Sequence, residues 1–303
     1  MNEIKNILLC GLGGLGCICA VQIFKNKSLN LKILVDESRY LKYREHPTFF
    51  NSKPYIFDYI LPSNDSYKAD LVIISTKNDG LDFAIKNVKN FVHKQTIFIS
   101  LLNGIHSEGK IAEKYGNENV LTTFYLGHSC IREGRNIYQD GVYNFIIGQK
   151  KNQYSKALKL VSDLFDKTYI NYQISENIEE EYWKKFIINI GINQLSAVTG
   201  LTLKPIKQDS ELSQRLLNLM HEAEMVAEKE GIKNHKSIFN SAVKFLFEEL
   251  DDAKTSMLQD IEAKRKTEVD IFAGTVIELG KKHNILTPEN EKIYTEIKEL
   301  ENR

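Results

Sequence analysis

Residues 4–26 read IKNILLCGLGGLGCICAVQIFKN, and this stretch decides the fold. Its first part, Ile4–Cys10, is a short apolar run bounded at once by glycines, which is typical of a buried strand. Its last part, Gly14–Asn26, has apolar residues at helical spacing. A strand that passes through a glycine-rich turn into a helix predicts the opening unit of a parallel α/β sheet.

The turn between these two elements carries a motif, because Gly11-Leu12-Gly13-Gly14-Leu15-Gly16 matches G-x-G-x-x-G. Its glycines permit a tight turn and the close approach of a pyrophosphate, which the N-terminus of the following helix stabilises. The bare pattern is weak, but its place directly after a predicted strand makes it specific. We therefore predict that all six residues contact a dinucleotide cofactor. The alternative is a glycine-rich packing turn with no ligand.

The rest of the chain changes character near residue 170. Before it, apolar strand-like runs alternate with helical stretches, which indicates a parallel sheet covered by helices. Residues 136–149 look like a hairpin that turns at Asp140–Gly141. From about Glu176 to His283 the periodic segments are helical. We predict an α/β Rossmann-like dinucleotide-binding domain at 1–172, followed by an all-α substrate and dimerisation domain at 173–303.

The overall composition argues against several classes of protein. The chain has 303 residues with 40 basic and 40 acidic side chains, so its net charge is zero, and no basic stripe indicates nucleic acid or a membrane surface. The four cysteines show no metal-ligand spacing, and we expect no metal site. No apolar run reaches the length of a transmembrane helix. The apolar start resembles a short signal peptide, but the glycine motif fits it better, so we expect a cytoplasmic protein.

Three strand-end positions bear on the cofactor. Asp36 ends the second predicted strand, 20 residues after Gly16, where an acidic residue accepts hydrogen bonds from the ribose of NAD and repels the 2′-phosphate of NADP. Arg39 could instead face a 2′-phosphate. The two residues therefore favour different cofactors, and Asp36, which occupies the usual position, slightly favours NADH. Lys77 and Asn103 each follow a predicted strand, at the edge where such sheets bind ligands. Alternatively, both are ordinary loop residues.

A polar stripe runs along the otherwise apolar segment at 183–193. Lys185, Asn189 and Asn193 are spaced i, i+4 and i+8, which puts them near one face of a helix. If this helix is buried, the stripe must be satisfied by partners or by a ligand. A lysine in such surroundings could donate a proton, and two amides could orient a polar substrate. An exposed stripe on a two-sided helix remains the alternative.

Two further segments, SMLQD at 256–260 and TEVD at 267–270, carry Ser256 and Glu268. One straight helix through both would hold these two residues about 18 Å apart, too far to share a small ligand. The start of TEVD resembles a helix N-cap signal. We therefore predict a break near Arg265–Lys266 that could bring Ser256 and Glu268 to one cleft. The alternative is a continuous helix with ordinary surface residues.

Together these motifs resemble the ketopantoate reductase family, over nearly the whole chain from Gly11 to Asp270. The resemblance rests on the order and spacing of five pieces: the glycine motif, Lys77, the Leu102-Asn103-Gly104 turn, W-x-K-x-x-x-N-x-x-x-N at 183–193, and SMLQD followed by TEVD. It implies an enzyme of pantothenate biosynthesis that uses NADPH or NADH to reduce ketopantoate to pantoate. The substrate would lie between the two domains.

The resemblance also implies catalytic roles. Lys185 would be the general acid that protonates the carbonyl oxygen. Asn103 would help to position this lysine and the nicotinamide, and Glu268 would order the substrate or Lys185. The chemistry is coherent, because hydride transfer leaves an alkoxide that a positioned ammonium can protonate.

Binding roles follow from the same resemblance. Asn189 and Asn193 would contact the hydroxyl end of the substrate, Ser256 would bind its carboxylate, and Lys77 would touch the cofactor. The small-molecule substrate would be the main partner, and exposed apolar positions of the helical half could form the seam of a homodimer.

The sequence departs from the family at three positions. Asp36 stands where NADPH-dependent members tend to carry a basic or neutral residue, Thr255 stands where many have a serine, and His128 matches nothing expected. Two other functions therefore remain open. One is an NAD-dependent D-2-hydroxy acid dehydrogenase acting on another branched substrate, and the other is a dinucleotide-binding sensor without turnover.

Overall fold

The glycine motif lies where the first strand of a parallel sheet meets the first helix. β1 (Asn6–Cys10) ends directly before it and α1 (Gly14–Lys25) begins within it, which confirms the predicted strand, turn and helix. The structure is a computed structural model, and it describes residues 1–127, 130–141, 143–150, 154–250 and 252–302.

Two units make up the described chain. The first combines Met1–Leu102 with Ser107–Ile178, and the second combines Asn103–His106 with Glu179–Arg303. The last strand, β12 (Tyr172–Ile174), lies in the first unit, and every later element in the described residues is helical. An α/β part followed by a helical part is the predicted order. The first unit continues to Ile178, and the short segment 103–106 belongs with the helices.

Eight strands form the main sheet of the first unit. Their order is β12, β11 (Tyr143–Gly148), β8 (Val120–Gly127), β7 (Ile97–Ser100), β6 (Leu71–Ile74), β1, β2 (Asn30–Leu34) and β5 (Tyr59–Ile60). The strands from β8 to β5 run parallel, whereas β11 is antiparallel to β8 and parallel to β12. β1 lies between β6 and β2 and is parallel to both, so the loops that leave these three strands emerge at the same end of the sheet.

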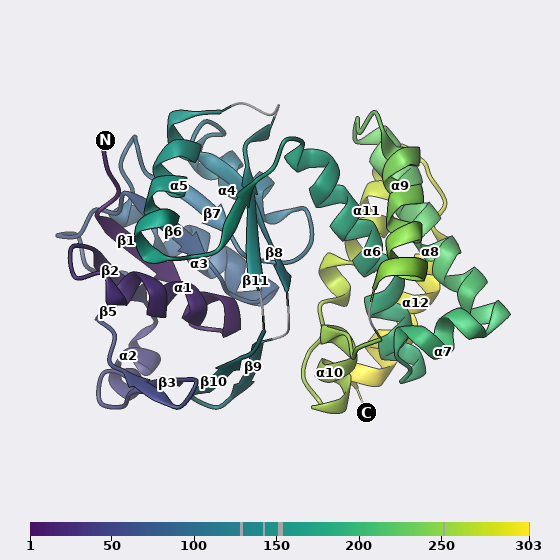
Figure 1. Cartoon of the computed structure of the whole chain (residues 1–303), viewed down its shortest axis with the longest axis horizontal. Coiled ribbons are helices and arrows are strands. Elements are labelled where there is room, and N and C mark those ends of the chain that lie inside the picture. Colours follow the sequence, from purple (N-terminus) through teal and green to yellow (C-terminus); the bar gives the residue numbers. More distant parts are fainter. Residues whose placement is uncertain (128–129, 142, 151–153, 251, 303) are drawn as a thin grey trace. The chain divides into compact units, whose positions relative to one another are not determined.

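Helices cover both faces of this sheet (Figure 1). α1 and α5 (Lys156–Thr168) pack with Ile7 and Leu9 of β1, whereas α3 (Leu81–Asn87) and α4 (Ser107–Tyr115) pack with Leu8 and Cys10. Successive side chains of a strand point to opposite faces, so the unbroken apolar run of β1 is buried on both sides. The unit also contains α2 (Glu37–Tyr43) and the 3-10 turns η1 (Asn78–Gly80) and η2 (Lys89–Phe91).

The predicted hairpin at residues 136–149 is wrong. Its two strands exist, as β10 (Asn136–Gln139) and β11, but they belong to different sheets. β10 pairs with β9 (Cys130–Glu133) and with β3 (Thr48–Phe50), which pairs with β4 (Lys53–Tyr55). Alternating apolar residues identify a strand but not its partner. The real hairpin, β9–β10, is tied to the segment before β3 by Arg135, whose Nε donates to the carbonyl of Pro47 at 2.8 Å.

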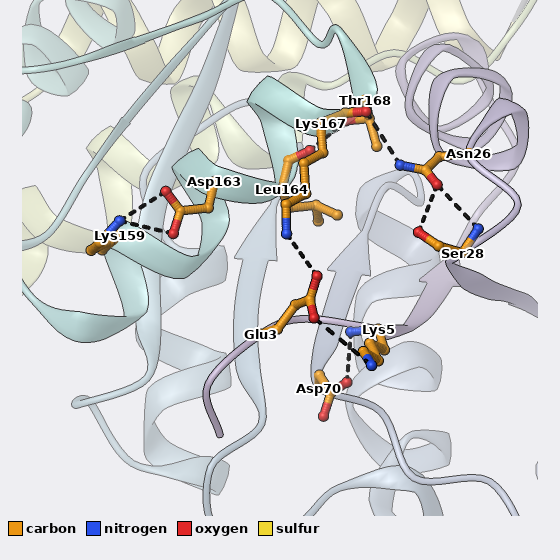
Figure 2. A network of polar contacts seen from close by, with 10 residues as sticks. All are labelled: Glu3, Lys5, Asn26, Ser28, Asp70, Lys159, Asp163, Leu164, Lys167 and Thr168. Carbon is orange, nitrogen blue, oxygen red and sulfur yellow. Dashed lines mark hydrogen bonds and ion pairs between the residues drawn. The ribbon is translucent and has the colours of Figure 1, made fainter.

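Polar contacts tie the start of β1 to its neighbours, at the edge of the sheet opposite the glycine motif (Figure 2). Lys167, in the last turn of α5, pairs with Glu3 at 2.6 Å, and its carbonyl accepts a hydrogen bond from Asn26 at 3.3 Å. The backbone N–H of Lys5 donates to Asp70 at 2.8 Å. These contacts anchor β1, and with it the loop that leaves its other end.

The second unit is a helical bundle that begins with α6 (Ile178–Thr199). After it come α7 (Leu203–Gln208), α8 (Ser210–Lys229), α9 (His235–Lys244) with a π-helical turn at Phe245–Glu249, α10 (Ser256–Glu262), the 3-10 turn η5 (Val269–Ile271), α11 (Ala273–His283) and α12 (Pro288–Glu301). Their apolar sides share one core, which includes Phe186, Met220 and Phe272.

The predicted break near Arg265–Lys266 is confirmed. α10 ends at Glu262, Lys264 adopts a left-handed φ of 49°, and a helical turn resumes only at Val269. The sequence patterns do not predict α12. The buried carboxylate of Glu222 holds its N-terminus, because it accepts hydrogen bonds from the backbone N–H groups of Glu289 and Asn290, both at 2.9 Å.

Three further features concern the described residues alone. The four cysteines are free thiols. No group of histidine, cysteine and acidic side chains could hold a metal ion. No helix is long and apolar enough to cross a membrane.

Candidate active site

The glycine motif forms a tight turn in which larger residues would clash. A Cβ on Gly11, whose φ is +97°, would lie 2.4 Å from the carbonyl oxygen of Ser75. A Cβ on Gly16 would lie 2.2 Å from the carbonyl oxygen of Gly11. Both contacts are with backbone atoms, which cannot move aside. The loop therefore packs tightly against the end of β6, and only glycine fits at these two positions.

The N-terminus of α1 is suited to an anion. Its N-cap residue is Gly13, which has no side chain to cap the first turn, and that turn contains no acidic residue. The first N–H groups of this 12-residue helix carry the positive end of the helix dipole. The loop and this helix end together offer N–H donors and the positive end of a dipole, which are the features that favour an anion. That this anion is the pyrophosphate of a dinucleotide stays a prediction.

Asp36 and Arg39 form an ion pair after β2. Arg39 Nη1 lies 2.7 Å from Asp36 Oδ2, and Asp36 Oδ1 accepts hydrogen bonds from the Ser38 hydroxyl and the Arg39 backbone, both at 2.8 Å. Partial burial raises the pKa of Asp36, but these hydrogen bonds and the guanidinium charge outweigh it and lower the pKa below its ordinary value. The carboxylate is therefore ionised at neutral pH, and its Oδ2 can accept a further hydrogen bond.

Lys77 leaves the sheet at the same edge as the glycine motif. It is exposed, it follows β6, and it is the N-cap residue of η1. Ser75, two residues earlier, has its carbonyl oxygen against Gly11. β6 is the parallel neighbour of β1. Lys77 therefore lies at the same end of the sheet as the glycine loop and the N-terminus of α1, which favour an anion.

Three predicted residues from distant parts of the sequence meet in the second unit. Asn103 Oδ1 accepts a hydrogen bond from Lys185 Nζ at 3.3 Å. Asn103 Nδ2 donates to Glu268 Oε2 at 2.8 Å. The amide thus presents its oxygen to an ammonium and its nitrogen to a carboxylate, which suits both charges. All three residues are half-buried, so a lysine that can donate a proton is held in a polar, partly desolvated place.

The turn after β7 explains how Asn103 reaches this place. Gly104 has a φ of +85°, and a Cβ on it would lie 3.3 Å from the carbonyl oxygen of Ile271 in η5. The turn therefore packs closely on the segment that follows Glu268. The Asn-Gly pair has two separate uses here, because asparagine supplies the amide and glycine permits the left-handed backbone and the close approach.

The turn that carries Glu268 is held from two sides. Before it, Thr267 donates from its backbone N–H and from its hydroxyl to Glu301 of α12, at 2.7 and 2.6 Å. After it, the backbone N–H of Ala273 donates to Gln194 Oε1 of α6 at 2.9 Å. These contacts fix the backbone on both sides of Glu268, and so they fix where its carboxylate meets Asn103.

The other predicted substrate residues form a chain of hydrogen bonds. Ser256 Oγ donates to Asn193 Oδ1 at 3.3 Å, and Asn193 Nδ2 donates to Asn189 Oδ1 at 2.8 Å. Ser256 is exposed, Asn189 is half-buried and Asn193 is buried. Among the described residues, Asn189 Nδ2 donates to no protein acceptor. The chain therefore ends on a donor that a polar ligand can use.

Sequence reasoning missed two residues that lie beside these groups. Ser75 has its carbonyl oxygen against Gly11 and its hydroxyl against Gly16, and nothing in the motif points to it. Ser196 lies on α6, and it did carry a signal. At 3.6 residues per turn it falls about 20° from Lys185 around the helix axis, within the polar stripe. His128, the unexpected histidine, lies outside the residues that the structure describes.

Two family models match the sequence, and between them they span most of the chain. The model described as Ketopantoate reductase PanE/ApbA matches residues 7–152. The model described as Ketopantoate reductase PanE/ApbA C terminal matches residues 177–301. A curated relative, the 2-dehydropantoate 2-reductase of Pyrococcus horikoshii, is 29% identical over 235 residues, which are 77% of this chain and 76% of that protein.

Solved structures share the fold along almost the whole chain. D-mandelate dehydrogenase, in a ternary complex with NADH and anilino(oxo)acetate, matches with a TM-score of 0.85 at 21% identity, over 98% of each chain. A ketopantoate reductase from Staphylococcus aureus, described as dimeric, matches with a TM-score of 0.77 at 20% identity, over 98% of this chain and 99% of that one. At these identities the two structures establish the fold, and they confirm the predicted fold class.

Proposed function

The chain belongs to the ketopantoate reductase family, a family of nicotinamide-dependent oxidoreductases, and we propose that it reduces ketopantoate to pantoate, a 2-keto acid to a D-2-hydroxy acid. The observation that carries this proposal is the set of hydrogen bonds from Lys185 through Asn103 to Glu268. It supplies what the reaction needs from the protein, namely a positioned proton donor in a partly desolvated site.

In this proposal Lys185 is the general acid. When bound, the nicotinamide cofactor supplies the hydride. Negative charge then develops on the substrate's carbonyl oxygen, and Lys185 Nζ stabilises it and donates the proton that completes the alcohol. Asn103 holds Nζ in place through its oxygen, and Glu268 holds Asn103 through its nitrogen. Such proton transfer contributes about 10²–10⁴-fold to the rate.

The chain Ser256–Asn193–Asn189 binds the rest of the substrate. Ser256 is exposed at the start of α10, and its hydroxyl turns its one hydrogen from Asn193 to the carboxylate when the keto acid binds. The free Nδ2 donor of Asn189, with Asn193 behind it, binds the substrate's hydroxyl end. Support comes from their mutual hydrogen bonds, which hold three polar groups in a row beside Lys185 on α6.

For the cofactor we propose a preference for NADH. Residues 11–16 and the N-terminus of α1 bind the pyrophosphate, Lys77 contributes positive charge, and Asp36 accepts hydrogen bonds from the adenosine ribose. The ionised state of Asp36 supports this preference, because it would repel a 2′-phosphate. Arg39 supports the opposite choice, NADPH, but its guanidinium is engaged by Asp36.

The test is an assay of the purified protein with NADH and with NADPH, in which ketopantoate is one of a panel of 2-keto acids. We expect turnover with ketopantoate and a higher kcat/KM with NADH. No turnover with any member of the panel would contradict the proposal. Tight cofactor binding measured by calorimetry, together with no turnover, would instead indicate a dinucleotide-binding sensor.

A second candidate is an NAD-dependent D-2-hydroxy acid dehydrogenase that acts on another branched substrate. Asp36 favours it, and so does the likeness to D-mandelate dehydrogenase, a protein of the same fold that was solved with NADH. The same panel distinguishes the two. A kcat/KM for a bulky keto acid such as benzoylformate at least tenfold above that for ketopantoate would favour the dehydrogenase.

We further propose that the protein is a cytoplasmic homodimer. The dimeric relative from Staphylococcus aureus supports the dimer, and the four unpaired thiols support a reducing compartment. Light scattering coupled to size exclusion tests the oligomeric state, and a mass near 35 kDa would contradict it, since one chain is 34.9 kDa.

A further inference from the structure

A pair of hydroxyl groups joins α6 to the start of α10. Ser196 Oγ lies 2.5 Å from Thr255 Oγ1, and Ser196 is fully buried. Ser196 also donates to the carbonyl oxygen of Asn193 at 3.3 Å, and Thr255 Oγ1 accepts from the backbone N–H of Leu258 at 3.2 Å. Each hydroxyl has one hydrogen, so the hydrogen of Ser196 goes to Asn193 and that of Thr255 goes to Ser196.

This pair lies directly beside the proposed carboxylate ligand. Thr255 precedes Ser256, whose Oγ donates to Asn193 Oδ1. Asn193 and Ser196 are about one turn apart on α6, and they contact two consecutive residues of the α10 start. Two adjacent hydrogen bonds between the same two segments fix both the distance and the rotation of α10 about its own axis.

The start of α10 needs such a contact. The helix has only seven residues, and isolated helices of that length are unstable in water. The residues before it, Asp252 to Lys254, are exposed, as are those after it from Glu262 to Lys266. Met257 and Leu258 pack into the core, but apolar packing is not directional. The hydrogen bond between the two hydroxyl groups is directional, and so it can fix the rotation of α10, which apolar packing alone does not.

We propose that Ser196 and Thr255 are positioning residues for substrate recognition, which hold the Ser256 hydroxyl beside Asn193, from where it can turn its hydrogen to the carboxylate of the keto acid. This inference rests on the proposed function and deepens it. Neither hydroxyl touches the substrate. Their effect is on where the Ser256 hydroxyl points, and therefore on the affinity for the acid and not on the proton transfer from Lys185.

The test uses three variants of the full-length protein. Thr255→Val keeps the size of the side chain but removes both the link and the helix cap. Ser196→Ala removes the link and the bond to the Asn193 carbonyl but keeps the cap. Thr255→Ser keeps the link and the cap. We expect Thr255→Val and Ser196→Ala to raise the KM for ketopantoate about fivefold, as the loss of one hydrogen bond would. Thr255→Ser should stay within about twofold of the wild type, since it keeps the hydrogen bond.

A second readout separates positioning from a general loss of structure. The methyl ester of ketopantoate lacks the carboxylate, so its kcat/KM should fall less than that of the acid in Thr255→Val and Ser196→Ala. The dissociation constant of NADH should not change. Thr199→Val is a matched control. Its hydroxyl donates to the carbonyl of Leu195 at 2.8 Å and accepts from the backbone N–H of Leu201 at 3.3 Å, and neither partner belongs to α10.

The outcomes are distinct. A larger loss for the acid than for the ester, in both link variants and not in the control, supports the inference. Equal losses for acid and ester, or an unchanged KM in Ser196→Ala, overturn it while the proposed function stands. A wild-type protein without turnover on ketopantoate overturns the proposed function, and this inference with it.

Discussion

Asn103 is the common partner of Lys185 and Glu268, although these residues stand 82 and 165 positions further along the chain. Its amide oxygen faces the ammonium and its amide nitrogen faces the carboxylate. The amide is neutral and can satisfy both charges at once, because it offers an acceptor to one and a donor to the other. Lys185 is therefore oriented in part by its hydrogen bond to Asn103.

Removal of the lysine should abolish catalysis without preventing cofactor binding. Lys185→Met should lower kcat by about 10²–10⁴-fold, the usual contribution of a general acid. The dissociation constant of NADH should change little, because Lys185 is not part of the cofactor site that we propose at the glycine motif and α1. Steady-state kinetics and calorimetry measure the two quantities. The matched control is Lys184→Met, whose ammonium lies 5.6 Å from the ring centre of Phe245; a comparable loss of kcat there would contradict the assignment.

Asn103 bonds to both Lys185 and Glu268, so the effects of losing Asn103 and of losing Glu268 should depend on one another. Asn103→Ala and Glu268→Ala should each lower kcat, and the double variant should be little worse than the poorer single variant, because both remove the same support of Lys185. A double-mutant cycle on kcat measures this coupling. Strictly multiplicative effects would show that Glu268 acts independently of Asn103.

The ion pair after β2 should set the choice of cofactor. Asp36→Ala should weaken NADH binding by about tenfold or more, the effect of losing hydrogen bonds to a charged group. It should also strengthen NADPH binding, because Arg39 is released and a 2′-phosphate no longer meets a carboxylate. Fluorescence titration with each cofactor checks both. Glu37→Ala, the adjacent exposed acid, should change neither, and an unchanged NADH affinity in Asp36→Ala would exclude the ribose contact.

A contact between η5 and α12 should make stability depend on pH. Partial burial raises the pKa of Asp270, but hydrogen bonds from Lys298 at 3.0 Å and from Tyr294 at 2.9 Å outweigh it, and the pKa lies below its ordinary value of 3.8. Because the folded pKa is depressed, the stabilisation is present above pH 3.8 and is lost as the pH falls through the folded pKa.

Lys298→Met should therefore lower Tm at pH 7 by about 2–4 °C, the shift expected for roughly 1 kcal/mol in a protein of this size. The difference from the wild type should shrink as the pH falls below 3.8 and through the depressed folded pKa of Asp270. Thermal unfolding at pH 7, 5 and 3 measures it. A difference that is the same at all three values would mean that Lys298 stabilises by packing and not by its charge.

The cysteines should be unreactive in the folded protein. Burial raises the pKa of Cys130 to about 11, and that of Cys10, Cys17 and Cys19 to about 12. Because the thiolate is the reacting form, a pKa near 11 in place of the ordinary 9.0 lowers its share at pH 8 by roughly a hundredfold. Ellman's reagent should react slowly with the native protein and quickly, at all four sites, in detergent. One fast thiol in the native protein would contradict this.

The opening strand, glycine motif and helix could be predicted because each is specified by neighbouring residues. The break between α10 and η5 could be predicted from helix geometry, since a straight helix would separate Ser256 from Glu268. The hairpin prediction failed for the opposite reason. Residues 136–148 show where two strands lie, but the partners of β10 are β9 and β3, and β3 is almost 90 residues earlier in the sequence.

The candidate site follows the same division. The polar stripe of α6 could be predicted from the sequence, because its residues are only four positions apart and their spacing is that of a helix. The link between Ser196 and Thr255, and the hold of Glu301 on Thr267, are not, because they join residues 59 and 34 positions apart. Only packing decides which of several hydroxyl and carboxyl groups meet, and packing is a property of the whole helical unit.

The distance in sequence between Asn103 and Glu268 also determines how long after Asn103 the ribosome adds Glu268. At 5–20 residues per second, a ribosome needs about 8–33 s to pass from one to the other. The strands around β1 have then all emerged and can pair, while the segment 103–106 still awaits its helices. A nascent chain can therefore fold its glycine motif long before Glu268 arrives. The contacts of Asn103 are completed only when most of the chain has been made.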